Sequence, residues 1–115
     1  METWKTCARF PNYQVSDLGR VRRHPDARTK GATPGRVLRQ ATGKDGYQLV
    51  CLYFGGRKRL MARVHQLVAE AFIGPRPDGY VTRHLDDDPR NNVPANLAYG
   101  TQEDNYADFL RNRGL

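Results

Sequence analysis

The sequence predicts a small α+β domain, in which an N-terminal antiparallel β-sheet with one packed helix is followed by a strand–loop–strand–helix segment. Two patterns carry this prediction. Short apolar runs bounded by turn residues fill much of positions 1–63, which is typical of antiparallel strands. From position 64 the apolar residues follow the period of a helix. A chain of 115 residues is long enough for one modest core and too short for two independent ones.

The first expected hairpin lies near the start of the chain. Residues 13–16 and 20–22 are its strands, and residues 17–19, which include a glycine, are its turn. Trp4 and Phe10 are expected to join the aromatic ring at position 13 in a small apolar cluster that holds the hairpin down.

A second group of strands is expected before position 64. Residues 24–34 are rich in Pro, Gly, Thr and charge, which predicts an exposed loop. Residues 36–39 are a further candidate strand. Residues 47–53 and 59–64 predict a hairpin that turns at Gly55-Gly56.

A single amphipathic helix is predicted over residues 64–73. Its apolar side chains fall at intervals of three and four residues, so they form one stripe that can face the core: Val64, Leu67, Val68, Ala71 and Phe72. Gly74-Pro75 ends the helix.

The segment 80–105 predicts strand, loop, strand and helix. Residues 80–83 form a short strand, and the acidic, Asn- and Pro-rich stretch 86–94 is a loop. Residues 96–99 extend again before a glycine. Thr101, followed by two acidic residues, is a helix N-cap.

Three polar side chains lie on the three expected elements of that segment, one on each. His84 lies at the end of the first strand, Asn96 on the second strand and Asn105 on the final helix. We therefore expect them to converge on one point.

Charge favours a polyanionic partner. The formal net charge is +7, and the theoretical pI is near 9.8. One window contains a single acid, Asp26, among seven basic residues: Arg20, Arg22, Arg23, Arg28, Lys30, Arg36 and Arg39. A solvated basic face is the alternative interpretation.

Several classes of protein are disfavoured. No apolar run approaches the length that spans a bilayer and the first residues lack a signal-peptide core, so we expect a cytoplasmic protein with no membrane partner. Cys7 and Cys51 stand alone without a CxxC pair, so neither a structural zinc site nor a disulfide framework is expected.

The segment 81–105 resembles the HNH endonucleases of the ββα-metal fold, in the branch found in homing and phage-borne nucleases. The matching strings are Val-x-x-His, Asp-x-x-Pro-x-Asn-Asn, Pro-x-Asn-Leu-x-Tyr-Gly-Thr and Glu-x-Asn. The helical string Val-His-x-Leu-Val-Ala-x-Ala-Phe-Ile-Gly, from position 64, matches the same family. The resemblance implies a ββα-metal motif with His84 as general base, Asn96 as the residue that orients it, and Asn105 as a metal ligand. Asn96 would act either by fixing the loop or by holding one ring nitrogen of His84.

These residue types suit phosphodiester hydrolysis. The reaction needs a water deprotonated near neutral pH, for which a histidine is suited. It also needs a cation beside the leaving oxygen. A hard divalent ion, Mg²⁺ or alternatively Mn²⁺, prefers oxygen ligands and keeps several waters, so an Asn amide oxygen and phosphate oxygens can suffice.

One residue departs from the family pattern. Many relatives carry Asp immediately before the first His, as a metal ligand, whereas this chain has Arg83. An arginine cannot bind a cation, although it can hold a phosphate bidentately. Asp86 and its two acidic neighbours could replace the missing carboxylate as metal ligands. We favour the alternative, in which they form a solvated turn. His65, at the start of a helix, is outside the His–Asn–Asn triplet, and a structural or DNA-contacting role is favoured.

The N-terminal part resembles a NUMOD-type module. The string is Phe-Pro-x-Tyr-x-Val-Ser-x-Leu-Gly-Arg-Val-Arg, from position 10. The resemblance implies a DNA-contacting β-module over residues 1–63, ahead of an HNH motif over residues 64–115, in one compact unit. A hairpin that merely packs on the core is the alternative. The expected nucleic-acid-binding residues are Arg20, Arg22, Arg23, Arg36, Arg39 and Arg83.

The sequence thus predicts a metal-dependent HNH endonuclease that nicks double-stranded DNA, because one chain carries one site. No obligatory protein partner is inferred, and a dimer is left open. Two alternatives remain. One is an HNH-fold DNA-binding protein with weak or no cleavage, and the other is a small basic RNA- or ribosome-associated protein.

Overall fold

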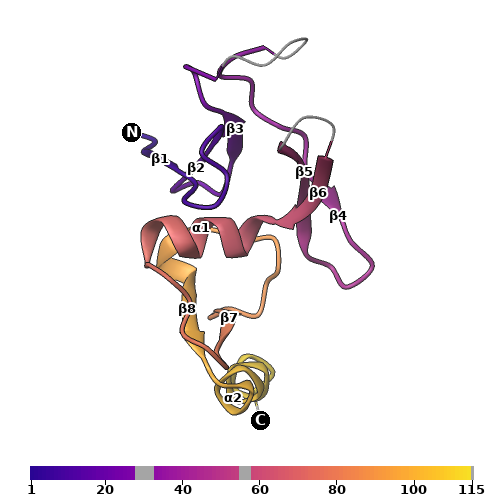
Figure 1. Ribbon diagram of the computed structural model, residues 1–115. Helices are drawn as coiled ribbons and strands as arrows, with labels where there is room; N and C mark the ends of the chain where they lie inside the picture. Colours follow the sequence, from indigo (N-terminus) through magenta and orange to yellow (C-terminus); the bar gives the residue numbers. More distant parts are fainter. Residues whose placement is uncertain (28–32, 55–57, 115) are drawn as a thin grey trace.

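The computed structural model describes residues 1–27, 33–54 and 58–114. Within them lie two three-stranded antiparallel sheets, a two-stranded hairpin and two α-helices (Figure 1). The predicted α+β class is confirmed. The expected Gly55-Gly56 turn lies outside the described residues, as do Arg28 and Lys30. None of the described helices has the length and apolar character that a membrane crossing requires.

The first sheet contains β1 (Trp4–Thr6), β2 (Tyr13–Ser16) and β3 (Val21–Arg23), in that order. The hairpin of β2 and β3 is as predicted, whereas β1 was not predicted. The turn needs Gly19, because its φ is +79° and an added Cβ would lie 2.9 Å from the backbone oxygen of Asn92. The turn of the first sheet therefore packs directly against the loop 86–94.

The second sheet contains β4 (Ala41–Thr42), β5 (Gln48–Phe54) and β6 (Lys58–Arg63). The N-terminal strands thus form two sheets, not the single sheet that was expected. The predicted strand 36–39 is also wrong: only one bridge, between Val37 and Arg22, is present there. Most side chains of that stretch are exposed, so little burial supports a longer ladder.

Helix α1 (Val64–Phe72) occupies the centre of the molecule, between the first sheet and the C-terminal hairpin (Figure 1). It contacts strands of both N-terminal sheets and of that hairpin. Leu67 and Val68 are almost fully buried, and each buried side chain of this size contributes roughly 2 kcal/mol. The predicted stripe is therefore a core shared by both halves of the chain.

The C-terminal part is β7 (Val81–His84), a 3-10 turn η1 (Pro94–Asn96), β8 (Leu97–Gly100) and α2 (Gln102–Asn112). The order strand, loop, strand, helix is as predicted, but each strand begins one residue later. Asn96 consequently ends the 3-10 turn and does not lie on a strand.

Candidate active site

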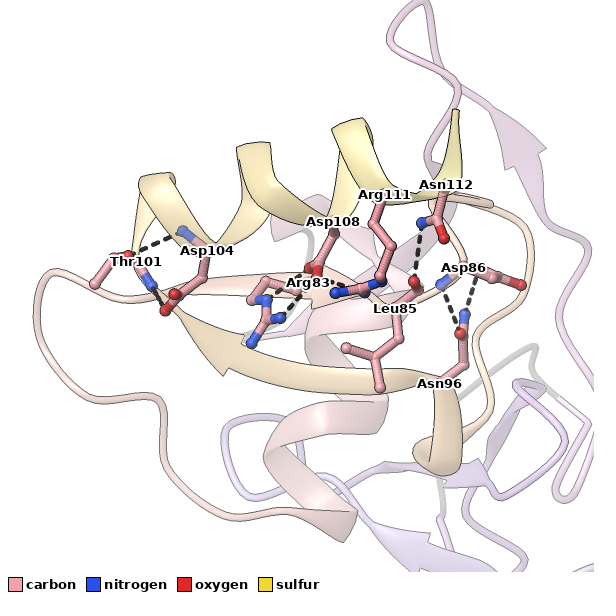
Figure 2. Close-up of polar contacts among 9 residues, drawn as sticks. All are labelled: Arg83, Leu85, Asp86, Asn96, Thr101, Asp104, Asp108, Arg111 and Asn112. Atoms are coloured by element: carbon pink, nitrogen blue, oxygen red, sulfur yellow. Dashed lines mark hydrogen bonds and ion pairs between the residues drawn. The ribbon is translucent and has the colours of Figure 1, made fainter. Parts of the chain in front are cut away.

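Helix α2 follows β8 directly, begins at a capping box and is tied near its last turn to the residue after β7. Thr101 is the predicted N-cap: its hydroxyl accepts the amide N–H of Asp104 at 3.1 Å, and the Asp104 carboxylate accepts the amide of Thr101 at 3.0 Å. Near the other end, the Asn112 side chain donates to the Leu85 carbonyl at 2.9 Å (Figure 2). These contacts set where α2 places its side chains over the hairpin.

His84, at the end of β7, is held by an asparagine that the sequence did not single out. Its Nε2 lies 2.7 Å from Oδ1 of Asn92, and only 6% of the residue is exposed. Because an amide oxygen accepts only, Nε2 carries the proton and Nδ1 is the basic nitrogen. Asn92 therefore holds the His84 ring nitrogen, which was one of the two roles expected of Asn96.

Two more rings pack against His84. The His65 ring is stacked on Tyr47 with centroids 4.7 Å apart, and the His65 and His84 centroids are 4.9 Å apart. His65 is 4% exposed, and this burial lowers its pKa to about 4. Electrostatic repulsion from His84 and Arg63 lowers the pKa of His65 in the same direction. A neutral His65 thus forms one wall against which His84 is positioned.

Asn96 clamps the loop. Its amide nitrogen donates to the Asp86 carboxylate at 2.8 Å, and its oxygen accepts the Asp86 amide at 3.1 Å (Figure 2). The same nitrogen also donates to the Asn91 carbonyl at 2.9 Å. Asp86 has a lowered pKa, because Asn91, the Asp88 backbone and Asn96 all donate to its carboxylate. Asp86 is thus part of the loop scaffold, in line with the favoured solvated turn.

His84 and Asn105 line one cavity of about 290 Å³, which we call the histidine cavity. Asp45, Thr82, Asp87 and other residues complete its wall. Asn96 does not line it, so two of the three expected residues converge and the third acts from the loop.

The donors around the histidine cavity suit a hydrated hard cation rather than a fully protein-coordinated one. The side-chain amide of Asn105 makes no hydrogen bond to any other described residue, so its oxygen is available to a metal ion. The two carboxylates are already engaged: Asp45 with Arg63 at 3.0 Å and Asp87 with Arg113 at 3.8 Å. Within the described ranges, no group of three or more His, Cys, Asp or Glu side chains could hold a metal ion.

Arg83 points away from that cavity and into an ion pair. Its Nε and Nη2 donate to the two oxygens of Asp108 at 2.7 and 2.8 Å, and Arg111 donates to the same carboxylate at 2.8 Å (Figure 2). Asp108 is 1% exposed, and the bond from Arg83 holds its pKa below the usual range. Gly100 leaves space for the Arg83 side chain, because an added Cβ at position 100 would lie 2.5 Å from Cδ of Arg83. Arg83 therefore clamps β7 to α2, and we do not propose it as a phosphate ligand.

The other predicted DNA-contacting arginines differ in accessibility. Arg23 is 6% exposed and donates to the Tyr13 hydroxyl at 3.2 Å, so it is a structural residue and leaves the proposed set. Arg20 is exposed and paired with Glu2, whose pKa this bond lowers to about 2. Arg22 is partly buried, stacked over Trp4 and bonded to Gln14.

Two further arginines, Arg36 and Arg39, are exposed beside β3. The Arg23 amide donates to the Arg36 carbonyl at 2.9 Å, and the Leu38 amide donates to the Val21 carbonyl at 2.8 Å. This pairing brings the two ends of the basic window together on the first sheet.

Comparisons with known proteins agree with this geometry. Residues 62–107 match the HNH endonuclease family model, and residues 2–53 match the NUMOD4 motif model. The segment carrying His84, Asn92 and Asn105 thus matches the HNH endonuclease family, and the segment before it matches the NUMOD4 motif.

A particular relative covers nearly the whole chain. The DNA endonuclease I-HmuI of Bacillus phage SP01 is 33% identical over 103 residues, which are 89% of this chain and 54% of that protein. A solved structure described as DNA binding and cleavage by the HNH homing endonuclease I-HmuI matches with a TM-score of 0.77 at 33% identity. That match covers 97% of this chain and 59% of the other. This chain therefore spans somewhat more than half the length of its relative.

Proposed function

We propose that this chain is a divalent-metal-dependent DNA endonuclease that hydrolyses a phosphodiester bond at the histidine cavity. The observation that carries the proposal is that His84 and Asn105, from two elements of an HNH motif, line one cavity. Double-stranded DNA is the proposed substrate. One chain supplies one such site, so we propose nicking of a single strand.

His84 would act as the general base. The Asn92 side-chain oxygen accepts a hydrogen bond from Nε2–H of His84, so Nδ1 can take a proton from the attacking water. The stacked rings of Tyr47 and His65 restrict how the imidazole can turn. The residues around His84 thus preorganise one basic nitrogen.

Asn105 would hold the metal, together with waters and DNA phosphate oxygens. When bound, a divalent ion neutralises the charge that grows on the leaving oxygen. Mg²⁺ fits this oxygen-donor set, and Mn²⁺ is the alternative. Arg83 is paired with Asp108 and cannot bind a cation, so Asn105 is the one ligand that the motif assigns. We therefore expect the affinity for metal to be low until DNA is present.

The pairing of Arg83 with Asp108 also favours a second candidate, a DNA-binding protein of the HNH fold with little or no cleavage. In that case Arg83 replaces a metal-binding carboxylate, and the fold serves only to contact DNA. The two candidates differ in one measurement, which is strand scission.

The test is cleavage of supercoiled plasmid with Mg²⁺, with EDTA as the metal control. His84→Ala should lose about 10²–10⁴-fold in rate with nearly unchanged DNA affinity. His24→Ala is the matched control, because His24 lines neither the histidine cavity nor the adjoining one. Equal cleavage by wild type and His84→Ala would refute the assigned base, and binding without scission by wild type would favour the second candidate.

A further inference from the structure

A second cavity of about 310 Å³ adjoins the histidine cavity, and we call it the arginine cavity. Tyr47, Thr82 and Asn105 line both cavities, so the two share one wall. Arg63 and Arg76 lie at the arginine cavity.

The two cavities differ in the sign of their charge. The histidine cavity includes two carboxylates, those of Asp45 and Asp87. None of the described residues that line the arginine cavity is acidic. Arg63 is paired with Asp45, whereas Arg76 has no carboxylate partner in the described part of the chain and donates only to the Tyr80 carbonyl, at 2.5 Å. A cavity of this composition suits an anion.

The start of helix α1 lies at the arginine cavity. Arg63 is its N-cap, and His65 and Gln66, in the first turn, line the cavity. No side chain caps these N–H groups, and the first turn carries no acidic residue. By contrast, α2 has both a capping box and acidic residues in its first turn. The positive end of α1 is therefore uncompensated by the chain itself.

His65 supplies an independent sign of a missing partner. The residue is 4% exposed, and its Nδ1 is buried without a hydrogen-bond partner among the described residues. Buried polar atoms are nearly always satisfied, so an orphaned one at a cavity wall calls for an explanation.

We propose that the arginine cavity binds a DNA backbone phosphate that flanks the scissile phosphate, through Arg76, Arg63 and the first N–H groups of α1. This assignment rests on the proposed function and names the part of the substrate that lies beside the reacting bond. The flanking phosphate sets the register of the strand, so that the next phosphate meets His84 and Asn105 across the shared wall.

The experiment is an NMR titration of the ¹⁵N-labelled full chain, which at 13.1 kDa gives resolvable amide signals. The probe is the dinucleotide TpT, which carries one phosphodiester, in metal-free buffer. We expect the amide signals of His65 and Gln66 to shift. Arg76→Gln should weaken TpT binding about fivefold to tenfold, because it removes one charge-assisted contact. Lys5→Gln, an exposed site on β1 with the same charge change, should bind as wild type does.

Three outcomes would overturn the proposal. TpT shifts no amide at the start of α1, Lys5→Gln weakens binding as much as Arg76→Gln does, or inorganic phosphate binds at these amides while TpT does not. The last result would assign the cavity to a free phosphate or monoester. Since TpT binding needs neither metal nor His84, the titration can succeed with His84→Ala even if plasmid cleavage fails, which separates this proposal from the proposed function.

Discussion

Replacing Asp108 with Asn should destabilise the protein by about 3 kcal/mol. The native carboxylate accepts two charge-assisted hydrogen bonds from Arg83, at 2.7 and 2.8 Å, and each such bond contributes roughly 1.5 kcal/mol. The sum lies at the lower end of the 3–5 kcal/mol range for breaking a buried pair, because the Arg83 side chain remains 18% exposed and can be partly hydrated. Arg111, at 62% exposed, contributes less than about 1 kcal/mol.

The assay is urea unfolding followed by circular dichroism, applied to a double-mutant cycle. Asp108→Asn, Arg83→Met and the double variant should give a coupling free energy of about 2–3 kcal/mol. Arg111→Gln, which removes only the exposed partner, is the control and should cost less than about 1 kcal/mol. A coupling below about 0.5 kcal/mol would show that the pair does not hold β7 to α2.

The pair also predicts a pH dependence. The pKa of Asp108 is lower in the folded protein than in the unfolded chain, so the unfolded state binds more protons as the solution is acidified. The contribution is therefore complete above the unfolded pKa, near about 4, and is lost as pH falls through the lower folded pKa. Wild type should lose stability over that interval more steeply than Asp108→Asn.

Three further predictions concern the site and the DNA. Gly19→Ala should cost about 1 kcal/mol and slow cleavage with unchanged DNA affinity, because the new Cβ presses on the backbone of Asn92; unaltered cleavage in a plasmid assay would contradict this. Arg20→Gln with Arg22→Gln should flatten the slope of log affinity against log salt by up to about 2 units, and an unchanged slope would mean that neither reaches DNA. Asn105→Ala should lose cleavage in a way that raised Mg²⁺ partly restores, whereas a loss indifferent to Mg²⁺ would argue against Asn105 as a metal ligand.

The elements with strong local signals were predictable. The helical stripe from Val64 and the N-cap at Thr101 rest on spacing and side-chain chemistry within a few residues, and both are present. Strands β1 and β4 were missed because three- and two-residue edge strands carry almost no periodic signal. The strand expected at 36–39 failed because its register depends on burial that the fold does not provide.

The site was predictable in part. His84 and Asn105 were placed by the motif, but nothing local distinguishes Asn92 from its neighbour Asn91, and only the folded loop brings one of them to the imidazole. The burial of Arg23 did have a signal: it shares the period-two face of Val21, which points to the core. The Arg83–Asp108 pair joins residues 25 positions apart, so no short pattern could reveal it.

The shared helix α1 has a consequence for the proposed endonuclease. Because this one helix packs on the first sheet and on the β7–β8 hairpin alike, the distance between DNA that the sheet would contact and the bond that would be cut at His84 is built into the core and does not depend on a linker. A variant with looser packing at Leu67 or Val68 should therefore lose cutting accuracy, seen as a spread of nick positions, before it loses affinity for DNA.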